Sequence, residues 1–329
     1  MNFGETVAAA VAGDAIKRIY PHLVKAMPLG KSHDVQLSEK SLARHLTYVS
    51  RWAEQYNFLG LSSPKDSRSE TIPLRLTNVP RRYRGNALAD DTPDLHEDAF
   101  LSARDCLVLL GDPGAGKTTS LKRLCLQLLG EPAQNELGFQ VPLLVVLREL
   151  DRDTSIIPYL ADVLGITVDN PATDQDRTSP RIYGFDAVEK IGEFLDAMGA
   201  VLIVDGLDEL PSDQRSAVER ELQALNTFAR YAKIIVSCRS GDYNRPMQGF
   251  SVYEILPLSN DEVRRISESW LGDASQFFDH LNSKPYRDII DRPLLLSFLL
   301  FLFKNEGALP ARPSQNISKG CLQTTKRLG

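Results

Sequence analysis

The stretch Gly111–Ser120, GDPGAGKTTS, limits the fold more than any other part of the chain. It fits the pattern G-x-x-x-x-G-K-[ST] and lies between the apolar stretch CLVLL and the helical pattern TSLKRLCLQLL. Glycines in this context let backbone N–H groups close around phosphate oxygens, and the N-terminus of the following helix adds its positive dipole end. The stretch therefore predicts a phosphate-binding loop after a buried strand.

Four apolar stretches predict a parallel sheet. They are short and rich in leucine and β-branched residues, and helical segments separate them: CLVLL, VPLLVVL, VLIVD and KIIVSC. Strands that are buried on both faces have this nearly continuous apolar character. The expected fold class is α/β, with a P-loop NTPase parallel sheet covered by helices, an N-terminal helical region and a small C-terminal helical lid.

The 329 residues are long for one compact domain, so two or three packed units are expected. Helical patterns cover about 1–28 and 37–60, and the second has one apolar face, formed by Leu37, Leu42, Leu46, Val49, Trp52 and Tyr56. The polar stretch 166–184 is interpreted as a surface insertion. Ser259 and Glu262 match a capping box, which predicts the first helix of the lid.

Composition excludes several classes. With 43% hydrophobic and 25% charged residues, the chain can build a core, and its net charge of −5 makes nucleic acid an unlikely partner. The N-terminus lacks the basic region of a signal peptide, and the apolar run Pro293–Phe303 is about half the ~20 residues of a membrane span. Four scattered cysteines indicate reduced thiols rather than a metal site. We therefore expect a cytoplasmic protein without a membrane partner.

The residues that carry chemistry follow from the loop. Lys117 would reach the β- and γ-phosphates, and the Thr118 hydroxyl would ligate Mg²⁺. Asp205 ends the buried strand VLIVD and would hold the same ion, directly or through water. The residues expected to bind the nucleotide phosphates are Gly111, Asp112, Pro113, Gly114, Ala115, Gly116, Lys117, Thr118 and Thr119.

Three further residues have two interpretations each. Asp208 and Glu209 follow Asp205 after one glycine and one leucine, so either can polarise the attacking water or simply be a solvated acid in the first turn of the next helix. Arg239 follows the strand KIIVSC. The ends of parallel strands meet at one rim, so Arg239 would sense the γ-phosphate, unless it is an ordinary surface arginine.

The order of these motifs resembles the NACHT group of STAND nucleotide-binding proteins. The resemblance rests on GDPGAGKTT (the Walker A motif), D-G-L-D-E after an apolar strand (Walker B), S-C-R-S, YEILPLSNDEV and DRPLLLSFLLFL. It implies a switch that is closed with ADP, open and oligomeric with ATP, and slow in turnover. It assigns Asp205 and Asp208 or Glu209 to the metal and the water, Arg239 to sensing and Pro293 to the adenine.

The resemblance also divides the chain. It implies an N-terminal helical leader at 1–95, the NACHT domain at 96–257, a helical lid at 258–310 and an irregular tail at 311–329. Residues 316–329 lack helical periodicity, and codons can be chosen so that a shifted frame encodes an amphipathic helix start. We interpret the tail as frameshifted and the chain as a truncated relative of a longer receptor; the alternative is a disordered natural tail.

Three classes of function stay open at this point. The first is a nucleotide-gated signalling ATPase that binds ATP or ADP with Mg²⁺, forms an ATP-dependent homo-oligomer and responds to a protein trigger or effector. Bacterial relatives place it in defence against phage or in programmed cell death. The second is a housekeeping P-loop enzyme, such as a kinase or an AAA-type motor. The third is a nucleotide-binding fragment without hydrolysis.

Overall fold

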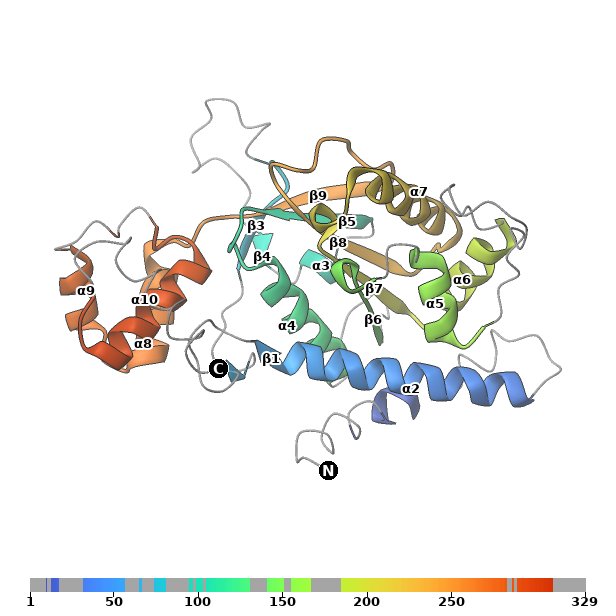
Figure 1. Ribbon diagram of the computed structural model, residues 1–329, viewed down its shortest axis with the longest axis horizontal. Coiled ribbons are helices and arrows are strands. Elements are labelled where there is room, and N and C mark those ends of the chain that lie inside the picture. Colours follow the sequence, from blue (N-terminus) through green and yellow to red (C-terminus); the bar gives the residue numbers. More distant parts are fainter. Residues whose placement is uncertain are drawn as a thin grey trace, which may run out of the picture.

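The computed structural model describes residues 10, 13–17, 32–56, 65–66, 74–80, 95–96, 99–102, 105–130, 141–150, 155–166, 185–282, 286 and 289–309. These residues contain one seven-stranded sheet in the order β4-β3-β9-β5-β8-β7-β6 (Figure 1). Helices pack around the sheet, and three further helices form a cluster beside it (Figure 1). The predicted α/β class is confirmed.

Five adjacent strands, β9, β5, β8, β7 and the edge strand β6, are parallel and carry the core. The apolar stretches of the sequence form four of them, β5 (Cys106–Gly111), β6 (Val141–Val146), β7 (Ala200–Asp205) and β8 (Lys233–Arg239). All residues of β5, β6 and β7 are buried, which explains their apolar character. The fifth strand, β9 (Phe250–Ile255), is partly exposed and less apolar, so the pattern did not reveal it.

The other strands lie towards the N-terminus of the chain. β3 (Arg75–Thr77) pairs antiparallel with β9 and with β4 (Leu95–His96), so a strand from the expected leader region belongs to the central sheet. β1 (Gln55–Tyr56) and β2 (Lys65–Asp66) form a separate two-stranded ladder. β3 lies within the stretch TIPLRLT, whose first three residues are outside the described part of the chain.

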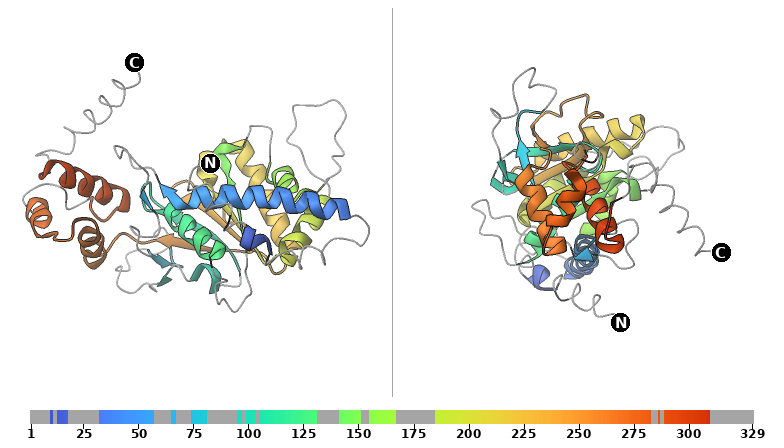
Figure 2. Two further views of the ribbon diagram at one scale, coloured as in Figure 1. Left: turned by 90° about the horizontal axis from the view of Figure 1, so that it is seen from below. Right: turned by 90° about the vertical axis from the view of Figure 1, so that its left-hand side faces the viewer.

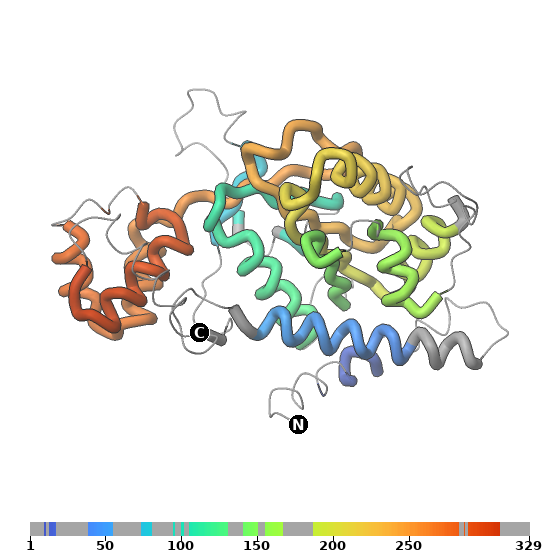
Figure 3. Tube along the Cα trace, in the orientation of Figure 1, coloured from blue at the N-terminus to red at the C-terminus, as the bar shows by residue number. Residues whose placement is uncertain are grey.

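The helices that pack against the sheet lie on both sides of it. In Figure 1, α2 and α4 lie below it and α7 above it. The long helix α2 packs across α4, α5 and the edge strand β6 (Figure 3). Their bounds are α2 Ser32–Glu54, α3 Ala99–Ser102, α4 Lys117–Leu129, α5 Ile156–Leu164, α6 Phe185–Ala197 and α7 Ser212–Phe228, with the 3-10 turns η3 Leu147–Glu149 and η4 Leu207–Glu209.

The bounds of α2 correct the sequence prediction. The apolar face predicted a helix over 37–60, but the helix begins at Ser32 and ends at Glu54. Tyr56 lies in β1, where it pairs with Lys65, because strand pairing replaces the helical turn at this point. On the helix, Leu42, Leu46 and Val49 are buried as predicted.

Side chains from two helices close the sheet edge at β6. The backbone N–H of Leu144 donates to Nε2 of His45 at 3.1 Å, and its carbonyl accepts from the hydroxyl of Tyr159 at 3.2 Å. Burial lowers the pKa of His45 to about 4, so its imidazole is neutral near pH 7 and Nε2 can accept. The backbone N–H and carbonyl of Leu144 therefore both have hydrogen-bond partners, although no further strand of the described ranges pairs with β6 at this edge.

The region predicted to be a lid contains the helices α8 (Asn260–Leu271), α9 (Ser275–Asn282) and α10 (Pro293–Glu306), which Figure 2 shows beside the sheet; we keep the name lid for these three helices. The capping box of Ser259 and Glu262 is confirmed at the start of α8. Glu262 also forms an ion pair at 3.0 Å with Arg75 of β3, which ties the lid to the sheet. In the described part of the chain, no helix has the length and hydropathy needed to cross a membrane.

Several predictions concern residues outside the described ranges. Of the first predicted helix, residues 10 and 13–17 are described, and all of them are helical. Of the predicted insertion 166–184, Ile166 alone is described, and the tail 311–329 lies outside altogether. Cys106, Cys125 and Cys238 are buried and free, as the scattered spacing predicts.

Candidate functional site

The phosphate-binding loop connects β5 to α4, as predicted. Gly114 and Gly116 have φ angles of 77° and 101°, in the region that favours glycine. A Cβ at Gly116 would lie 2.6 Å from Cδ1 of Leu74, and one at Gly114 would lie 3.0 Å from Cβ of Leu294. The two glycines therefore permit both the loop conformation and the close approach of β3 and the lid.

Lys117 begins α4 and folds back over the loop. Its Nζ donates to the carbonyl oxygen of Gly111 at 2.7 Å and to that of Asp112 at 3.4 Å. Burial lowers the pKa of Lys117, and the carboxylates of Asp208 and Asp205 oppose this shift. The ammonium group is therefore held at the loop, in an electrostatic field set mainly by these two acids.

A hydroxyl and a carboxylate meet next to the loop. The Thr118 hydroxyl donates to Asp205 at 3.0 and 3.3 Å. Ser237 of β8 donates to Oδ1 of Asp205 at 2.6 Å and accepts from the backbone N–H of Gly206 at 2.8 Å. β8 lies between β5 and β7 in the sheet, so Ser237 stands beside the strand of the acid and fixes Asp205 from there.

This group of oxygens fits Mg²⁺. The ion prefers oxygen ligands and commonly takes one or two protein carboxylates, completing its octahedron with water and substrate phosphates. Thr118 and Asp205 supply such a partial set, and Ser237 orients the carboxylate. Within the described ranges, no group of three or more His, Cys, Asp or Glu residues forms a self-sufficient metal cage.

The two later acids lie on η4 rather than in the first turn of α7, which begins at Ser212. Gly206, with a φ of 89°, turns the chain into η4. The side chain of Asp208 is 5% exposed. It forms an ion pair at 2.8 Å with Nε of Arg239 and accepts from the Arg239 backbone N–H at 2.9 Å. Asp208 and Arg239 therefore hold each other at the rim of the sheet.

Glu209 has a looser environment. Its side chain is 34% exposed, and Oε1 lies 3.8 Å from a guanidinium nitrogen of Arg148 on η3. Burial raises the pKa of Glu209, and Arg148 opposes the shift. The sequence analysis did not single out Arg148, although it directly follows the stretch VPLLVVL at the end where the parallel strands meet.

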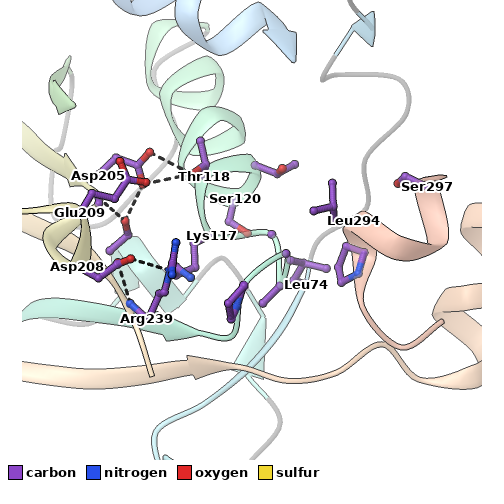
Figure 4. Close-up of a pocket in the computed structure, with 18 of the residues that line it drawn as sticks. Leu74, Lys117, Thr118, Ser120, Asp205, Asp208, Glu209, Arg239, Leu294 and Ser297 are labelled. Atoms are coloured by element: carbon purple, nitrogen blue, oxygen red, sulfur yellow. Dashed lines mark hydrogen bonds and ion pairs between the residues drawn. The ribbon is translucent and has the colours of Figure 1, made fainter. Parts of the chain in front are cut away.

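One cavity of about 520 Å³ gathers these residues between the sheet and the lid (Figure 4). Most residues predicted for the site line it, namely Pro113, Gly114, Ala115, Gly116, Lys117, Thr118, Thr119, Asp205, Asp208, Glu209, Arg239 and Pro293. Gly111 and Asp112 do not line it and contribute carbonyl oxygens to Lys117 instead. The prediction missed Leu74, Ser120, Arg148, Gly206, Ser237, Ile266, Leu294 and Ser297.

The lid contacts the phosphate loop directly. Pro293 is the first residue of α10, where a proline fits because no helical hydrogen bond requires its N–H. The next backbone N–H, of Leu294, donates to the carbonyl oxygen of Gly114 at 3.2 Å. The first turn of α10 therefore forms one wall of the cavity (Figure 4).

The fold and the loop geometry define a nucleotide-binding protein of the P-loop NTPase class. The family model described as NACHT domain matches residues 105–274, just over half of the chain. The chain belongs to the NACHT family.

Two other comparisons complete this result. A solved structure of a single-substitution variant of RuvB from Thermotoga maritima is similar with a TM-score of 0.30 and 17% sequence identity. The match covers 70% of this chain and 65% of that one, so the chain spans about two thirds of that protein's length. No curated protein sequence matches the chain.

Proposed function

We propose that this protein is an ATP-binding, slowly hydrolysing signalling switch in which the bound nucleotide controls the lid. The observation that carries the proposal is the contact of Leu294 in the lid with Gly114 in the phosphate loop. A nucleotide in the cavity would touch both parts, so its phosphates can bias the position of the lid.

The two ends of the cavity suit the two ends of ATP or ADP. Lys117 and the loop N–H groups would bind the phosphates, and Thr118 and Asp205 would hold Mg²⁺. When bound, Mg²⁺ neutralises charge on the phosphate oxygens. The other end is apolar and suits a base, with Leu74, Ile266, Pro293 and Leu294 along it. A volume of about 520 Å³ lies within the roughly 300–1,000 Å³ of small-molecule sites.

The contacts of the two later acids support a division of roles. Oδ1 of Asp208 accepts a hydrogen bond from the backbone N–H of Arg239, and Oδ2 forms the ion pair with its guanidinium. Asp208 is therefore suited to orient this arginine as the γ-phosphate sensor. Glu209 lies in the cavity wall with a raised pKa and a long ion pair, which suits a group that polarises water. We therefore assign the water to Glu209 and sensing to Arg239.

Nucleotide binding, turnover and assembly of the purified protein test this proposal together. Mg²⁺-dependent ATP binding, slow hydrolysis and a larger species in ATP than in ADP by size exclusion are expected. Lys117→Ala should lose binding and serves as the negative control. Rapid turnover without a trigger would replace the switch by a motor or housekeeping ATPase, and binding without hydrolysis or assembly would indicate a nucleotide-binding fragment.

The setting of the switch follows from the family resemblance of the sequence. It would be a cytoplasmic protein in bacterial defence against phage or in programmed cell death, with a protein trigger or effector as partner. Expression in bacteria challenged with phage, beside the Lys117→Ala variant, tests this setting. Equal survival with both variants would count against a role in defence.

A further inference from the structure

The turn η3 lies between the N-terminal helix α2 and the acids of η4. Its two charged residues have partners on different elements. The carboxylate of Glu149 accepts from the hydroxyl of Tyr48 on α2 at 2.7 Å, and the guanidinium of Arg148 lies 3.8 Å from Glu209 on η4. η3 and η4 also pack against each other. One turn thus joins a helix outside the sheet to the cavity.

We propose that Tyr48 is a positioning residue for Glu209 and acts through Glu149 and Arg148. This inference rests on the proposed function, because it takes Glu209 as the acid that polarises water. It assigns to α2, which lies outside the matched NACHT region, an indirect influence on Glu209.

Competition between neighbouring charges provides the mechanism. Arg148 and Glu149 are consecutive, so their side chains leave η3 in different directions and can pair only if the carboxylate of Glu149 turns away from α2. The hydrogen bond from Tyr48 holds this carboxylate towards α2 and leaves Arg148 to Glu209. Without that hydroxyl, Glu149 can pair with Arg148 and draw it away from Glu209.

Contacts on both sides of Tyr48 hold α2 in place, so its hydroxyl can fix the position of Glu149. His45, one helical turn before Tyr48, accepts from the backbone of β6, the strand that leads into η3. Trp52, one turn after Tyr48, packs under the ammonium of Lys122 on α4 at 5.0 Å. The hydroxyl of Tyr48 therefore belongs to a segment that is anchored on both sides.

The charged groups that act on Glu209 come from four elements. Arg148 of η3 and Arg239 of β8 lower its pKa, whereas Asp205 of β7, Asp208 of η4 and burial raise it. Arg148 has the largest effect among these charges. Loss of its contact should therefore move the titration of Glu209 to higher pH.

Two matched tyrosine variants test the proposal. Tyr48→Phe removes the hydroxyl that reaches η3. Tyr159→Phe removes a hydroxyl that donates to Leu144 in β6, the strand that leads into η3. For each variant, kcat and KM for ATP are measured. The titration of Glu209 is followed by carboxyl ¹³C NMR of the nucleotide-free protein, with Glu209→Gln identifying the signal.

Tyr48→Phe should lower kcat by about threefold to fivefold, as expected for loss of a partly exposed ion pair, and leave KM unchanged. It should also raise the pH at which Glu209 titrates, and Arg148→Gln should reproduce that shift. Tyr159→Phe should change neither property. An unmoved Glu209 titration in Tyr48→Phe, or an equal shift in Tyr159→Phe, overturns the proposal. Because the titration needs no nucleotide, a wild-type protein that fails to hydrolyse ATP refutes the proposed function separately.

Discussion

Two walls of the cavity hold their polar groups in different ways. The inner wall, which comprises Thr118, Asp205, Ser237, Asp208 and Arg239, comes from α4, β7, η4 and β8. Its hydrogen bonds and ion pair span 2.6–3.3 Å, and both of its carboxylates are about 5% exposed. These groups are oriented by the sheet itself.

The outer wall comprises Arg148, Glu209 and Leu294, on η3, η4 and α10. Its ion pair is 3.8 Å long, with side chains that are 54% and 34% exposed. Leu294 is 51% exposed and contacts the loop through one backbone hydrogen bond. Contacts of this kind can exchange partners at small cost in free energy.

The difference between the two walls suggests a division of roles, in which the inner wall binds the nucleotide and the outer wall responds to it. If the inner wall binds a metal and phosphates as proposed, its groups are already oriented and need little rearrangement. Under the proposed function, the outer wall holds the parts whose contacts change with the nucleotide, namely Glu209, which we assign to the water, and the helices of the lid. Four variants or conditions can break or sharpen this comparison.

Glu209→Gln should have the largest effect. Loss of a general base commonly costs about 10²–10⁴-fold in rate, so hydrolysis should fall at least about 100-fold. ATP affinity and the free energy of unfolding should stay nearly unchanged, because Glu209 is held by a long, exposed ion pair. Single-turnover hydrolysis and equilibrium ATP binding check this; a larger rate loss in Asp208→Asn would reverse the assigned roles.

Ser237→Ala should weaken the inner wall at the metal. Partners that orient a metal ligand typically contribute about 10–100-fold to metal affinity, and Ser237 bonds both Asp205 and the backbone of Gly206. Titration of Mg²⁺ in the presence of ADP measures the effect. Ser240→Ala is the matched control, because Ser240 bonds Glu254 and does not line the cavity. Equal affinities in the two variants would contradict the role of Ser237.

Asp208→Asn should affect stability more than Glu209→Gln does. Removing one partner of a buried ion pair leaves the other charge unpaired, but Arg239 is half exposed and water can solvate it. We therefore expect a loss of about 1–2 kcal/mol in the free energy of unfolding. Urea denaturation measures it, and similar losses in both variants would remove the distinction between the walls.

We expect the smallest effect in the pH dependence of hydrolysis, which the protonation of Glu209 sets. The folded-state pKa of Glu209 lies above its ordinary value of 4.5, so hydrolysis should begin to fall on acidification at a higher pH than for an exposed glutamate. Arg148→Gln should move this limb further up. The contribution of Glu209 to stability has the opposite direction: it is complete below pH 4.5 and is lost as pH rises through the folded-state pKa. An acid limb at or below pH 4.5 would contradict the raised pKa.

The sequence predicts the parts of this molecule that depend on short stretches. β5, β6, β7 and β8 are continuous apolar runs, and the loop motif locates Lys117 and Thr118 between a strand and a helix. The capping box at Ser259 is equally local. In each case, neighbouring residues alone determine the backbone.

The sequence did not predict features that depend on contacts between residues far apart in the chain. Ser237 reaches Asp205 because β8 lies between β5 and β7, and strand order does not follow from apolar runs. Leu74 reaches Gly116 because β3 pairs with β9, whose partly polar sequence conceals a central strand. The helix α2 ends before Tyr56 because Gln55 and Tyr56 pair with residues 65–66 as a short antiparallel ladder instead of continuing the helix.

The closed edge of β6 gives α2 a second consequence, which concerns solubility. A chain that began at β3 would lack His45 and leave the Leu144 N–H without its acceptor on an open sheet edge. Such edges recruit strands from other copies, and the apolar run Leu143–Val146, which follows Pro142, would favour this aggregation. The helix α2 is therefore also expected to protect the nucleotide-binding core from aggregation with other copies.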